Sequence, residues 1–497
     1  MAHATDFYFY DMNLATLPDR RAAAAPHAPA VADDQTDLDN AAFLDVVQRA
    51  AGALRQRGVR AGDVVGIMLP NRAAFVVALF ATWRLGAVAT PISPTLVAAE
   101  VAYQVADAGA VVLVVDRDVE TTAAVLHVDD MGGEPRTAEP VTGNGDDLAL
   151  LIYTSGTTGR PKGVMLDNAN LNAMCAMVIE GFELTDADHS LLILPLFHVN
   201  GIVVSVLSPL LAGGRTTIAG RFDPATFFDR LESSRATYFS AVPTIYTMLL
   251  GLPAEVRPDT SAVRFAVCGA APASIELLEG FEKRYGIGLV EGYGLSEGSC
   301  ASTGNPLNGP RKVGTVGIPL PGQEIRIVDL AGAEVPQGEL GEVVIKGPNV
   351  MRGYLNRPEE TEKTLKDGWL HTGDVGRFDE DGYLVLVDRA KDMIIRGGEN
   401  IYPKEIETVV HQLAGVAEAA VVGRASGLYG EEPVLFVSAH PGAELDVDSI
   451  AAHLQASLSK YKLPVDITVL DTLPKNPVGK IDKPSLRKTL TATDPRI

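Results

Sequence analysis

The sequence lacks the marks of several protein classes. Cysteine is scarce: Cys175, Cys268 and Cys300 are the three among 497 residues. They lie far apart, with neither the spacing of zinc ligands nor an even number for disulfide pairing. No window approaches about eighteen uninterrupted apolar residues, so we predict no transmembrane span. The first residues have no basic segment followed by an apolar core, so we predict no secretory signal. These absences favour a cytoplasmic protein.

Positive charge is also in short supply. The formal net charge is −21, which argues against a nucleic-acid-binding protein, because such a protein would carry a basic surface. A polyanion would have to be held by a few local cations and backbone amides. The content of 46% hydrophobic and 21% charged residues is ordinary for a soluble globular enzyme. The length predicts two or more domains.

The first third of the chain alternates helix and strand patterns. Helical spacing of apolar residues runs from Ala41 to Gly58 and from Ala73 to Ala87, whereas apolar runs from Asp63 to Pro70 and from Ala110 to Asp116 predict buried strands. This alternation predicts an α/β fold with parallel sheets covered on both faces. The short acidic stretch from Arg117 to Asp147 is expected to be a surface loop.

Several later strands each run directly into an unusual loop. They are found in the segments "DLALLIYTSGTTG", "SLLILPLFHVNG", "ATYFSAVPT", "VRFAVCGAAPA" and "GLVEGYGLSEGS". Ligands of open α/β sheets gather at the carboxyl ends of the strands. These loops therefore predict one shared site.

The pattern changes from about Gly314 onward. Segments such as "QEIRIVD", "GEVVIKG" and "GYLVLVD" are short and alternating, and Gly-rich turns separate them, as in an antiparallel or barrel-like β unit. A small α+β piece follows "DRAKD". We place a domain boundary near Lys391, which gives a large domain over residues 1–390 and a small one over residues 391–497.

The loop "YTSGTTGRPKG", Tyr153 to Gly163, has the composition of an anion-binding loop. Its glycines allow the backbone to approach a phosphate closely, and its hydroxyls can donate to the phosphate oxygens. Lys162 or Arg160 can neutralise a β- or γ-phosphate. The loop is not a Walker A motif, because Gly163 stands where that motif places the magnesium-binding Ser or Thr. The plain alternative is a flexible Gly/Thr linker.

The motifs "TSGTTGRPKG", "GYGLSE", "LHTGD", "DRAKDMIIRGGENIYPKEIE" and "NPVGKIDK" occur in that order. Together they resemble the adenylate-forming superfamily of acyl-CoA synthetases, adenylation domains and luciferases, and within it the 4-coumarate, medium-chain and malonate type of CoA ligase. The resemblance extends from about Phe43 to Arg487. It implies stacked, mostly parallel αβ sheets with a barrel-like β subdomain and a mobile C-terminal domain. It also implies that ATP with Mg²⁺ activates a carboxylic acid as acyl-AMP, which is then transferred to coenzyme A.

The resemblance also assigns roles to single residues. It places the phosphate loop at Thr154, Ser155, Gly156, Thr157, Thr158, Gly159 and Lys162. The adenine slot and its flanks fall at Gly269, Ala270, Ala271, Pro272, Glu291, Gly292, Tyr293 and Gly294. The ribose, α-phosphate and magnesium contacts fall at Asp374, Arg389, Ser296 and Glu297. The hinge and the loop that approaches after domain rotation fall at Lys391, Gly397, Gly398 and Glu399.

Three more side chains complete the expected chemistry. Lys480 matches the lysine that reaches the reacting groups during adenylation, where an ammonium can bridge the attacking carboxylate and the charge on the α-phosphate; losing such a donor typically costs about 3–4 kcal/mol. Thr154 and His198 are grouped with it as catalytic residues, His198 as a gate beside the acyl site. The plain alternatives are a solvated surface lysine for Lys480 and a packed histidine for His198.

The acyl group is the least determined part of the function. The candidate pocket residues are small or apolar and include no cation: Phe197, His198, Val199, Asn200, Gly201, Val242, Cys268, Gly292, Gly298, Ser299, Cys300 and Ala301. Ligases for malonate-like diacids tend to have arginine where this chain has Gly292. A second carboxylate would be costly to bury without such a cation, so a monocarboxylic fatty or aromatic acid is expected.

Other functions share the nucleotide motifs. The acyl group could pass to the phosphopantetheine of a carrier protein, the chain could be a luciferase-like oxygenase, or it could be a non-catalytic nucleotide-binding relative. No integral membrane segment is expected, and the protein should be a monomer or homodimer.

Overall fold

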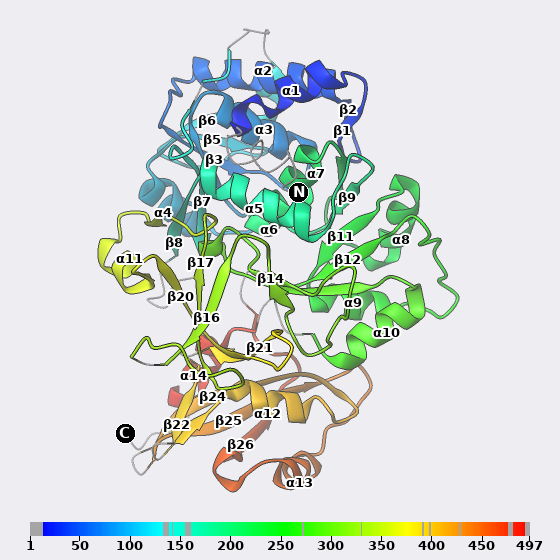
Figure 1. Cartoon of the computed structure of the whole chain (residues 1–497), viewed down its shortest axis with the longest axis vertical. Coiled ribbons are helices and arrows are strands. Elements are labelled where there is room, and N and C mark those ends of the chain that lie inside the picture. The colour runs from blue at the N-terminus through cyan, green and yellow to red at the C-terminus, as the bar shows by residue number, and fades with distance from the viewer. Residues whose placement is uncertain are drawn as a thin grey trace. The chain divides into compact units, whose positions relative to one another are not determined.

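The computed structural model describes residues 13–132, 139–141, 143–154, 161–270, 273–329, 331–389, 392–396, 399–426, 429–475 and 481–492. The chain forms two compact units, Met1–Ile325 with Val344–His371 and Arg326–Val343 with Thr372–Ile497. Figure 1 shows the elements of both units. The predicted domain boundary at Lys391 lies outside the described residues and stays a prediction.

The first unit contains a seven-stranded sheet in the order β18-β8-β7-β4-β3-β5-β6. The five neighbouring strands β7, β4, β3, β5 and β6 are parallel, whereas β8 and β18 pair antiparallel at the other edge. The strands are β3 (Val64–Met68), β4 (Val88–Pro91), β5 (Ala110–Val115), β6 (Ala124–His127), β7 (Leu148–Thr154), β8 (Lys162–Asp167) and β18 (Gly353–Tyr354).

The same unit contains a nine-stranded sheet in the order β15-β14-β13-β12-β11-β9-β10-β1-β2. The strands from β13 to β1 are parallel neighbours, and the strands at both ends are antiparallel. The strands are β1 (Pro29–Ala32), β2 (Asp37–Asp39), β9 (His189–Leu192), β10 (Arg215–Ile218), β11 (Tyr238–Ala241), β12 (Phe265–Cys268), β13 (Leu289–Tyr293), β14 (Thr303–Gly304) and β15 (Ile318–Pro319).

Helices connect these strands, and polar side chains set where several of them begin. Asp39 accepts from the N–H of Ala42 at the start of α2, and Asp167 accepts from the N–H of Asn170 at the start of α5, which satisfies backbone donors that the first helical turn leaves unpaired. The helices of this unit are α1 (Leu17–Ala24), α2 (Asn40–Gln56), α3 (Ala73–Arg84), α4 (Ala98–Ala108), α5 (Asn168–Gly181), α6 (Val199–Ile202), α7 (Ser208–Leu211), α8 (Pro224–Ser234), α9 (Pro243–Leu250), α10 (Ile275–Tyr285) and α11 (Pro358–Thr364).

A third sheet has the order β16-β17-β20-β19, with β21 paired to β20. Its strands are β16 (Glu324–Val328), β17 (Gly341–Lys346), β19 (Leu365–Lys366), β20 (Trp369–Phe378) and β21 (Leu384–Arg389). The boundary between the two units passes through β16, β17 and β20.

The rest of the second unit is an α+β arrangement with the sheet order β23-β22-β25-β24 and β26 beside β25. Its elements are β22 (Ile394–Arg396), β23 (Glu399–Ile401), α12 (Pro403–Val410), β24 (Val416–Ser426), β25 (Gly430–Ala439), α13 (Val447–Ser457), β26 (Asp466–Val469) and α14 (Lys483–Ala492). The predicted α/β fold class is thereby confirmed.

One sequence-based expectation was wrong. The stretch from Arg117 to Asp147 was expected to be a surface loop, but it contains β6 and a 3-10 helix, Val128–Gly132. β6 extends the seven-stranded sheet by pairing parallel with β5, from Val112↔Ala124 to Val115↔His127. The strand has only four residues, so its apolar run is too short to identify it as a strand from the sequence.

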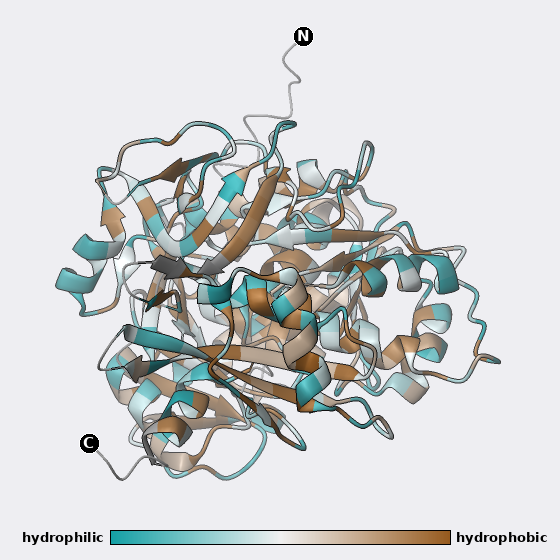
Figure 2. Ribbon diagram, turned by 90° about the horizontal axis from the view of Figure 1, so that it is seen from below, coloured by the Kyte–Doolittle hydropathy of each residue, from teal (hydrophilic) through white to brown (hydrophobic). Residues whose placement is uncertain are grey.

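Apolar residues make up much of the strands, as the brown segments in Figure 2 show. β5 and β12 are buried over four residues each, and helix α3 is buried over nearly its whole length. Strands and a helix that are apolar on all sides belong in the interior of a layered α/β unit. In the described residues, no helix is long and apolar enough to cross a membrane.

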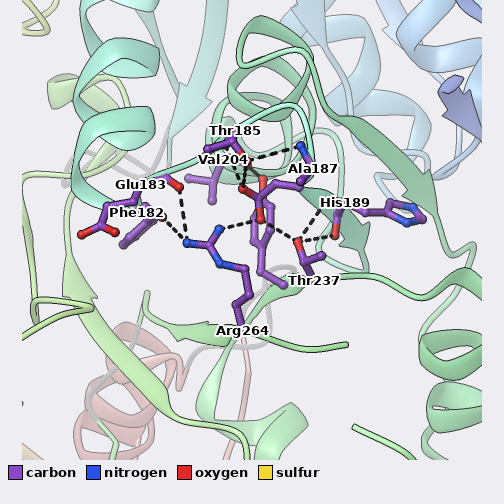
Figure 3. Close-up of polar contacts among 10 residues, drawn as sticks. Phe182, Glu183, Thr185, Ala187, His189, Val204, Thr237 and Arg264 are labelled. Atoms are coloured by element: carbon purple, nitrogen blue, oxygen red, sulfur yellow. Dashed lines mark hydrogen bonds and ion pairs between the residues drawn. The ribbon is translucent and has the colours of Figure 1, made fainter. Parts of the chain in front are cut away.

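A buried carboxylate fixes the starts of three strands in the nine-stranded sheet. Asp188, which is 1% exposed, accepts from the Thr185 N–H at 2.8 Å, from the Thr237 hydroxyl at 2.8 Å and from the Arg264 guanidinium at 2.6 Å. These residues precede β9, β11 and β12 respectively (Figure 3). The network lies at the amino ends of the parallel strands, and the loops expected to bind ligand follow their carboxyl ends.

Candidate active site

The predicted ligand loops follow strands that are neighbours in the sheet. β9, β11, β12 and β13 are parallel and adjacent, with pairs such as Ala241↔Cys268 and Cys268↔Glu291. Their carboxyl ends therefore share one edge of the nine-stranded sheet. The loops after these strands contain the residues predicted for the adenine slot, the acyl pocket and the magnesium site.

A glycine allows the loop after β13 to fold closely on itself. A Cβ on Gly294 would collide with the carbonyl of Cys300, whereas a Cβ on Gly269 would make only an ordinary contact, at 3.4 Å, with the carbonyl oxygen of Gly292. Ala270 has a φ of 65°, a conformation that disfavours residues with a side chain. Tyr293 is half-buried at the end of β13. The other predicted members of the slot wall, Ala271 and Pro272, lie outside the described residues.

The two ends of the predicted phosphate loop are held together by strand pairing. Thr154 ends β7, Lys162 begins β8, and the two residues are antiparallel partners. The loop between them is therefore anchored at both ends. Its predicted phosphate contacts at Ser155, Gly156, Thr157, Thr158 and Gly159 lie outside the described residues.

Tyr354 joins the predicted phosphate lysine to the predicted magnesium carboxylate. Its hydroxyl donates to Glu297 Oε1 at 2.8 Å, and its ring centroid lies 4.9 Å from the Lys162 ammonium. Lys162 also forms an ion pair with Glu360 of α11. Burial, followed by the charge of Glu297, raises the pKa of the Tyr354 hydroxyl, so it remains a hydrogen-bond donor. Ser296 and Glu297 lie in the 3-10 helix Ser296–Gly298.

A second network holds the base of the phosphate loop. The Tyr103 hydroxyl donates to the carbonyl of Pro161 at 3.0 Å, and the Tyr153 hydroxyl donates to Asp107 at 2.9 Å. Arg357 contacts Asp107 at 3.0 Å. Neither this network nor Tyr354 and Glu360 was predicted, because their partners come from α4, β18 and α11, far along the chain. The sequence signal for them is confined to their being polar or aromatic residues.

Glu291 lies on the wall of a separate hollow beside α10. The cavity measures about 280 Å³ and is lined by Leu278, Glu279, Glu282, Leu289, Glu291, Asn305, Gly309, Arg311, Lys312 and Val313. Burial raises the pKa of Glu291 to about 7, against the opposing effect of the backbone N–H groups of Gly314 and Ala273. Ala273 directly follows the predicted adenine-slot segment, so Glu291 contacts the base of that segment.

The predicted acyl pocket contains a strained backbone segment. Ser299 has a φ of 61° and Cys300 a φ of 142°, conformations that cost about 1–3 kcal/mol each and persist only where the surroundings fix them. The Ser299 hydroxyl donates to the carbonyl of Asn349 at 2.5 Å, and the Asn349 amide donates to the carbonyl of Gly298 at 2.9 Å. Burial raises the pKa of the Cys300 thiol to about 12, so this thiol is not an activated nucleophile.

His198 directly precedes the helix α6, with its ring 4.6 Å from that of Phe197. The loop before it is held by Asn71, whose side chain donates to the carbonyl of Leu194 and accepts from the N–H of Leu196, both at 2.9 Å. The segment just before the predicted gate is therefore joined to the loop that follows β3.

In the second unit, Asp374 and Arg389 are opposite one another in β20 and β21. Asp374 is buried, and its N–H donates to the Thr372 hydroxyl at 3.0 Å. Strand pairing thus brings together the two residues predicted to hold the ribose. Glu399 begins β23 opposite Arg396. The remaining predicted residues, Lys391, Gly397, Gly398 and Lys480, lie outside the described residues.

The described residues contain no group of three or more His, Cys, Asp or Glu side chains that could hold a metal by themselves. Glu297 nevertheless fits a magnesium ion that arrives with a nucleotide, because magnesium usually takes one or two protein carboxylates and completes its shell with phosphate oxygens and water.

Comparison with known proteins adds family information to this geometry. The model of the AMP-binding enzymes matches residues 18–355, and the model of the AMP-binding enzyme C-terminal domain matches residues 405–480. A feruloyl-CoA synthase from an Amycolatopsis species is 38% identical over 490 residues, which cover 96% of this chain and 99% of that protein. An oxalate–CoA ligase from Arabidopsis thaliana is 34% identical, with coverages of 94% and 95%. The crystal structure of ATP-bound MatB from Rhodopseudomonas palustris superimposes with a TM-score of 0.89 at 33% identity and covers 96% of this chain and 99% of that one.

Proposed function

Because the chain belongs to the family of AMP-binding enzymes, we propose that it is an AMP-forming acid–CoA ligase. In this function the enzyme joins a carboxylic acid to the α-phosphate of ATP, releases pyrophosphate, and then transfers the acyl group to the thiol of coenzyme A. The curated relatives named above are CoA ligases or synthases over nearly their whole length.

The observation that carries the proposal is the cluster around Tyr354. An ammonium, from Lys162, and a carboxylate, from Glu297, contact the same tyrosine, and Lys162 is one end of the predicted phosphate loop. A cation for phosphate oxygens beside a carboxylate for magnesium is the arrangement that a magnesium–nucleotide complex requires. An ion pair with a purely structural role would have no reason to lie at the end of a Gly- and Thr-rich loop together with a second carboxylate.

The residues of the cluster have distinct tasks in this proposal. Lys162 leaves Glu360 and neutralises the outer phosphates, while Ser296 donates its hydroxyl to the α-phosphate. Glu297 would hold the magnesium ion, which would supply positive charge to the phosphate oxygens. Tyr293 stacks on the adenine, and Asp374 with Arg389 binds the ribose hydroxyls. Lys480 brings the acid's carboxylate to phosphorus by offsetting the negative charge of both groups.

The second half of the reaction transfers the acyl group. The sulfur of coenzyme A attacks the carbonyl carbon of the acyl-adenylate, the bond between that carbon and the AMP oxygen breaks, and AMP leaves as the thiol proton is lost. In the family, rotation at the hinge matched by Lys391 replaces the Lys480 segment with the segment that contains Gly397, Gly398 and Glu399. Carrier-protein loading and luciferase-like oxygenation remain the alternative uses of the same intermediate, and the CoA ligases among the relatives favour neither.

For the acid, we propose an aromatic monocarboxylate of the hydroxycinnamate class. Gly292 contributes no cation to the pocket, and its missing Cβ would lie only 2.9 Å from the carbonyl oxygen of Thr303, so a side chain here would require the strands to move. Burying a second carboxylate without a cation is costly. The feruloyl-CoA synthase named above supports this choice, whereas the oxalate–CoA ligase makes a short diacid the competing one.

A panel of acids tests the proposal. Release of AMP and formation of the CoA thioester are measured with ferulate, 4-coumarate, benzoate, octanoate, malonate and oxalate, with and without coenzyme A. We expect the highest kcat/KM for a hydroxycinnamate, and thioester only when coenzyme A is present. A preference for oxalate or malonate would refute the substrate class, and failure of every acid to produce AMP would refute the ligase function.

A further inference from the structure

The described residues on the two sides of the Lys480 segment are joined to one another. Residues 476–480 lie outside the described residues, but both flanks are described. Lys475 and Ile481 form an antiparallel bridge, and the N–H of Asp482 donates to the carbonyl of Pro474 at 2.8 Å. The residues on the two sides of the segment are therefore held together, and Lys480 directly precedes Ile481 in sequence.

One buried carboxylate ties the residues that follow the segment to the rest of the unit. Glu407 Oε1 lies 2.8 Å from the ammonium of Lys483, the first residue of α14, and the two side chains are 10% and 17% exposed. The same oxygen accepts from the N–H of Val421 at 2.8 Å. Glu407 thus connects α12, β24 and the start of α14, three residues beyond Lys480.

Apolar packing and a second ion pair complete the frame. Ile481 packs against the cluster that includes Ala420, Val422 and Leu486, and Lys475 pairs with Glu418 of β24 at 2.8 Å. Apolar contacts tolerate small shifts of a chain segment, whereas the buried pair between Glu407 and Lys483 has one favourable geometry and is costly to break.

We propose that Glu407 is a positioning residue for Lys480, acting through Lys483. The inference rests on the proposed function and on the role given there to Lys480. A group that stabilises a transition state must be held to within about 0.5 Å, and a misplacement of about 1 Å can cost about a hundredfold in rate. Glu407 contacts no substrate in this proposal. It fixes the start of α14, which follows Lys480 by three residues.

Measurement of the two half-reactions on the full-length Glu407→Gln protein tests this role. Glutamine keeps the size of the side chain and an oxygen for the N–H of Val421, but removes the charge that Lys483 pairs with. Adenylation is followed by acid-dependent exchange of pyrophosphate into ATP, and thioester formation by supplying the acyl-adenylate with coenzyme A. We expect at least a tenfold loss in exchange and less than a twofold change in thioester formation, because only adenylation uses Lys480.

Two further variants separate positioning from a general loss of stability. Glu405 lies on α12, as Glu407 does, and pairs at 2.6 Å with Lys462 of the 3-10 helix Lys460–Lys462. Glu405→Gln breaks this pair and should leave both half-reactions within about twofold of the wild type. Lys483→Met removes the Glu407 pair from the other side. It should reproduce the selective loss, and the double variant should lose no more than either single one, as expected for partners in one interaction.

The outcomes are distinct. Equal losses in the two half-reactions, or an unchanged exchange rate in both Glu407→Gln and Lys483→Met, would overturn the positioning role. If the wild-type protein makes no adenylate from any acid, the proposed ligase function fails instead. If the wild type exchanges pyrophosphate and the variants are equally active, only the positioning role is rejected and the ligase function stands.

Discussion

At the residue scale, Tyr354 supports the proposed chemistry without contacting the substrates itself. It contacts both Glu297 and Lys162. Removing its hydroxyl with Tyr354→Phe keeps the ring beneath Lys162 but frees the carboxylate expected to hold magnesium. A hydrogen bond to a charged group is worth about 1.5–3 kcal/mol, so we expect kcat/KM for the magnesium–ATP complex to fall about tenfold or more. Steady-state kinetics over a range of ATP concentrations measures this.

The magnesium dependence provides the check on this prediction. If Tyr354 orients the magnesium carboxylate, raising the free magnesium concentration should recover part of the lost rate in Tyr354→Phe, with little effect on the wild type. A loss that does not respond to magnesium would contradict the assignment of Glu297.

Glu291 gives a prediction about pH. Burial raises its pKa from the usual 4.5 to about 7, so the folded state binds this proton more tightly than the unfolded state does. The resulting stabilisation is complete below pH 4.5 and is lost as the pH rises through 7. Glutamine does not ionise, so above pH 7 Glu291→Gln should exceed the wild type in free energy of unfolding, by up to about 3 kcal/mol.

Urea unfolding of both proteins at pH 5, 6, 7 and 8 measures the difference. Other groups, such as His189, whose pKa burial lowers to about 4, contribute equally to both proteins and cancel. A stability difference that stays constant across this range would show that Glu291 ionises normally.

The sequence identified which residue types gather at the site but not how they are held. Lys162 and Glu297 could be proposed from their motifs. Tyr354 and Glu360 could not, because their contacts depend on the pairing of β18 with β8, which joins residues nearly two hundred positions apart. A two-residue strand has no periodicity that a sequence pattern could reveal.

At the scale of elements, the network around Asp188 holds the amino ends of β9, β11 and β12. Replacing Asp188 by Asn keeps its shape but leaves the half-exposed Arg264 without a charged partner and weakens the bonds that Thr185 and Thr237 donate. We expect Asp188→Asn to lower the free energy of unfolding by about 2 kcal/mol or more, as measured by urea denaturation.

An exposed ion pair serves as the control for Asp188. Arg230 contacts both carboxylate oxygens of Asp34 at 2.8 and 2.9 Å, but this pair is largely solvated. Asp34→Asn should cost less than about 1 kcal/mol. Equal effects of the two substitutions would contradict a special role for the buried network.

The order of the elements was predictable where apolar runs were long, and less so elsewhere. The helices α2 and α3 and the strands β3 and β5 were predicted within a few residues, because their patterns are continuous. β6 was missed because its pairing with β5, rather than its own composition, makes it a strand. The same limit applies to β14, β15 and β18, each of two residues.

At the scale of the whole molecule, the proposed enzyme uses one acyl-adenylate in two half-reactions, which require different arrangements of the protein. Proline at the proposed hinge, Lys391→Pro, restricts backbone rotation at that position. We expect it to slow thioester formation at least tenfold more than it slows adenylation, because only the second step requires the rearranged state. Single-turnover measurements of both half-reactions test this, and equal losses would contradict the hinge.

The family relationship could be proposed from five ordered motifs, and the family models match both parts of the chain. The preferred acid could not be derived in the same way. The pocket residues come from at least four loops, and their small side chains leave room for many acids without selecting one. Lys391 and Lys480, on which the two-step mechanism depends, remain predictions.

The most direct test of the central claim compares acid-dependent AMP production by the wild-type protein and by Lys480→Ala. With a hydroxycinnamate, magnesium and ATP, the wild type should release AMP and pyrophosphate. The variant should release them at least a hundredfold more slowly. Lys480→Ala should still convert a supplied acyl-adenylate and coenzyme A to the thioester. Equal AMP production by the two proteins would contradict the account.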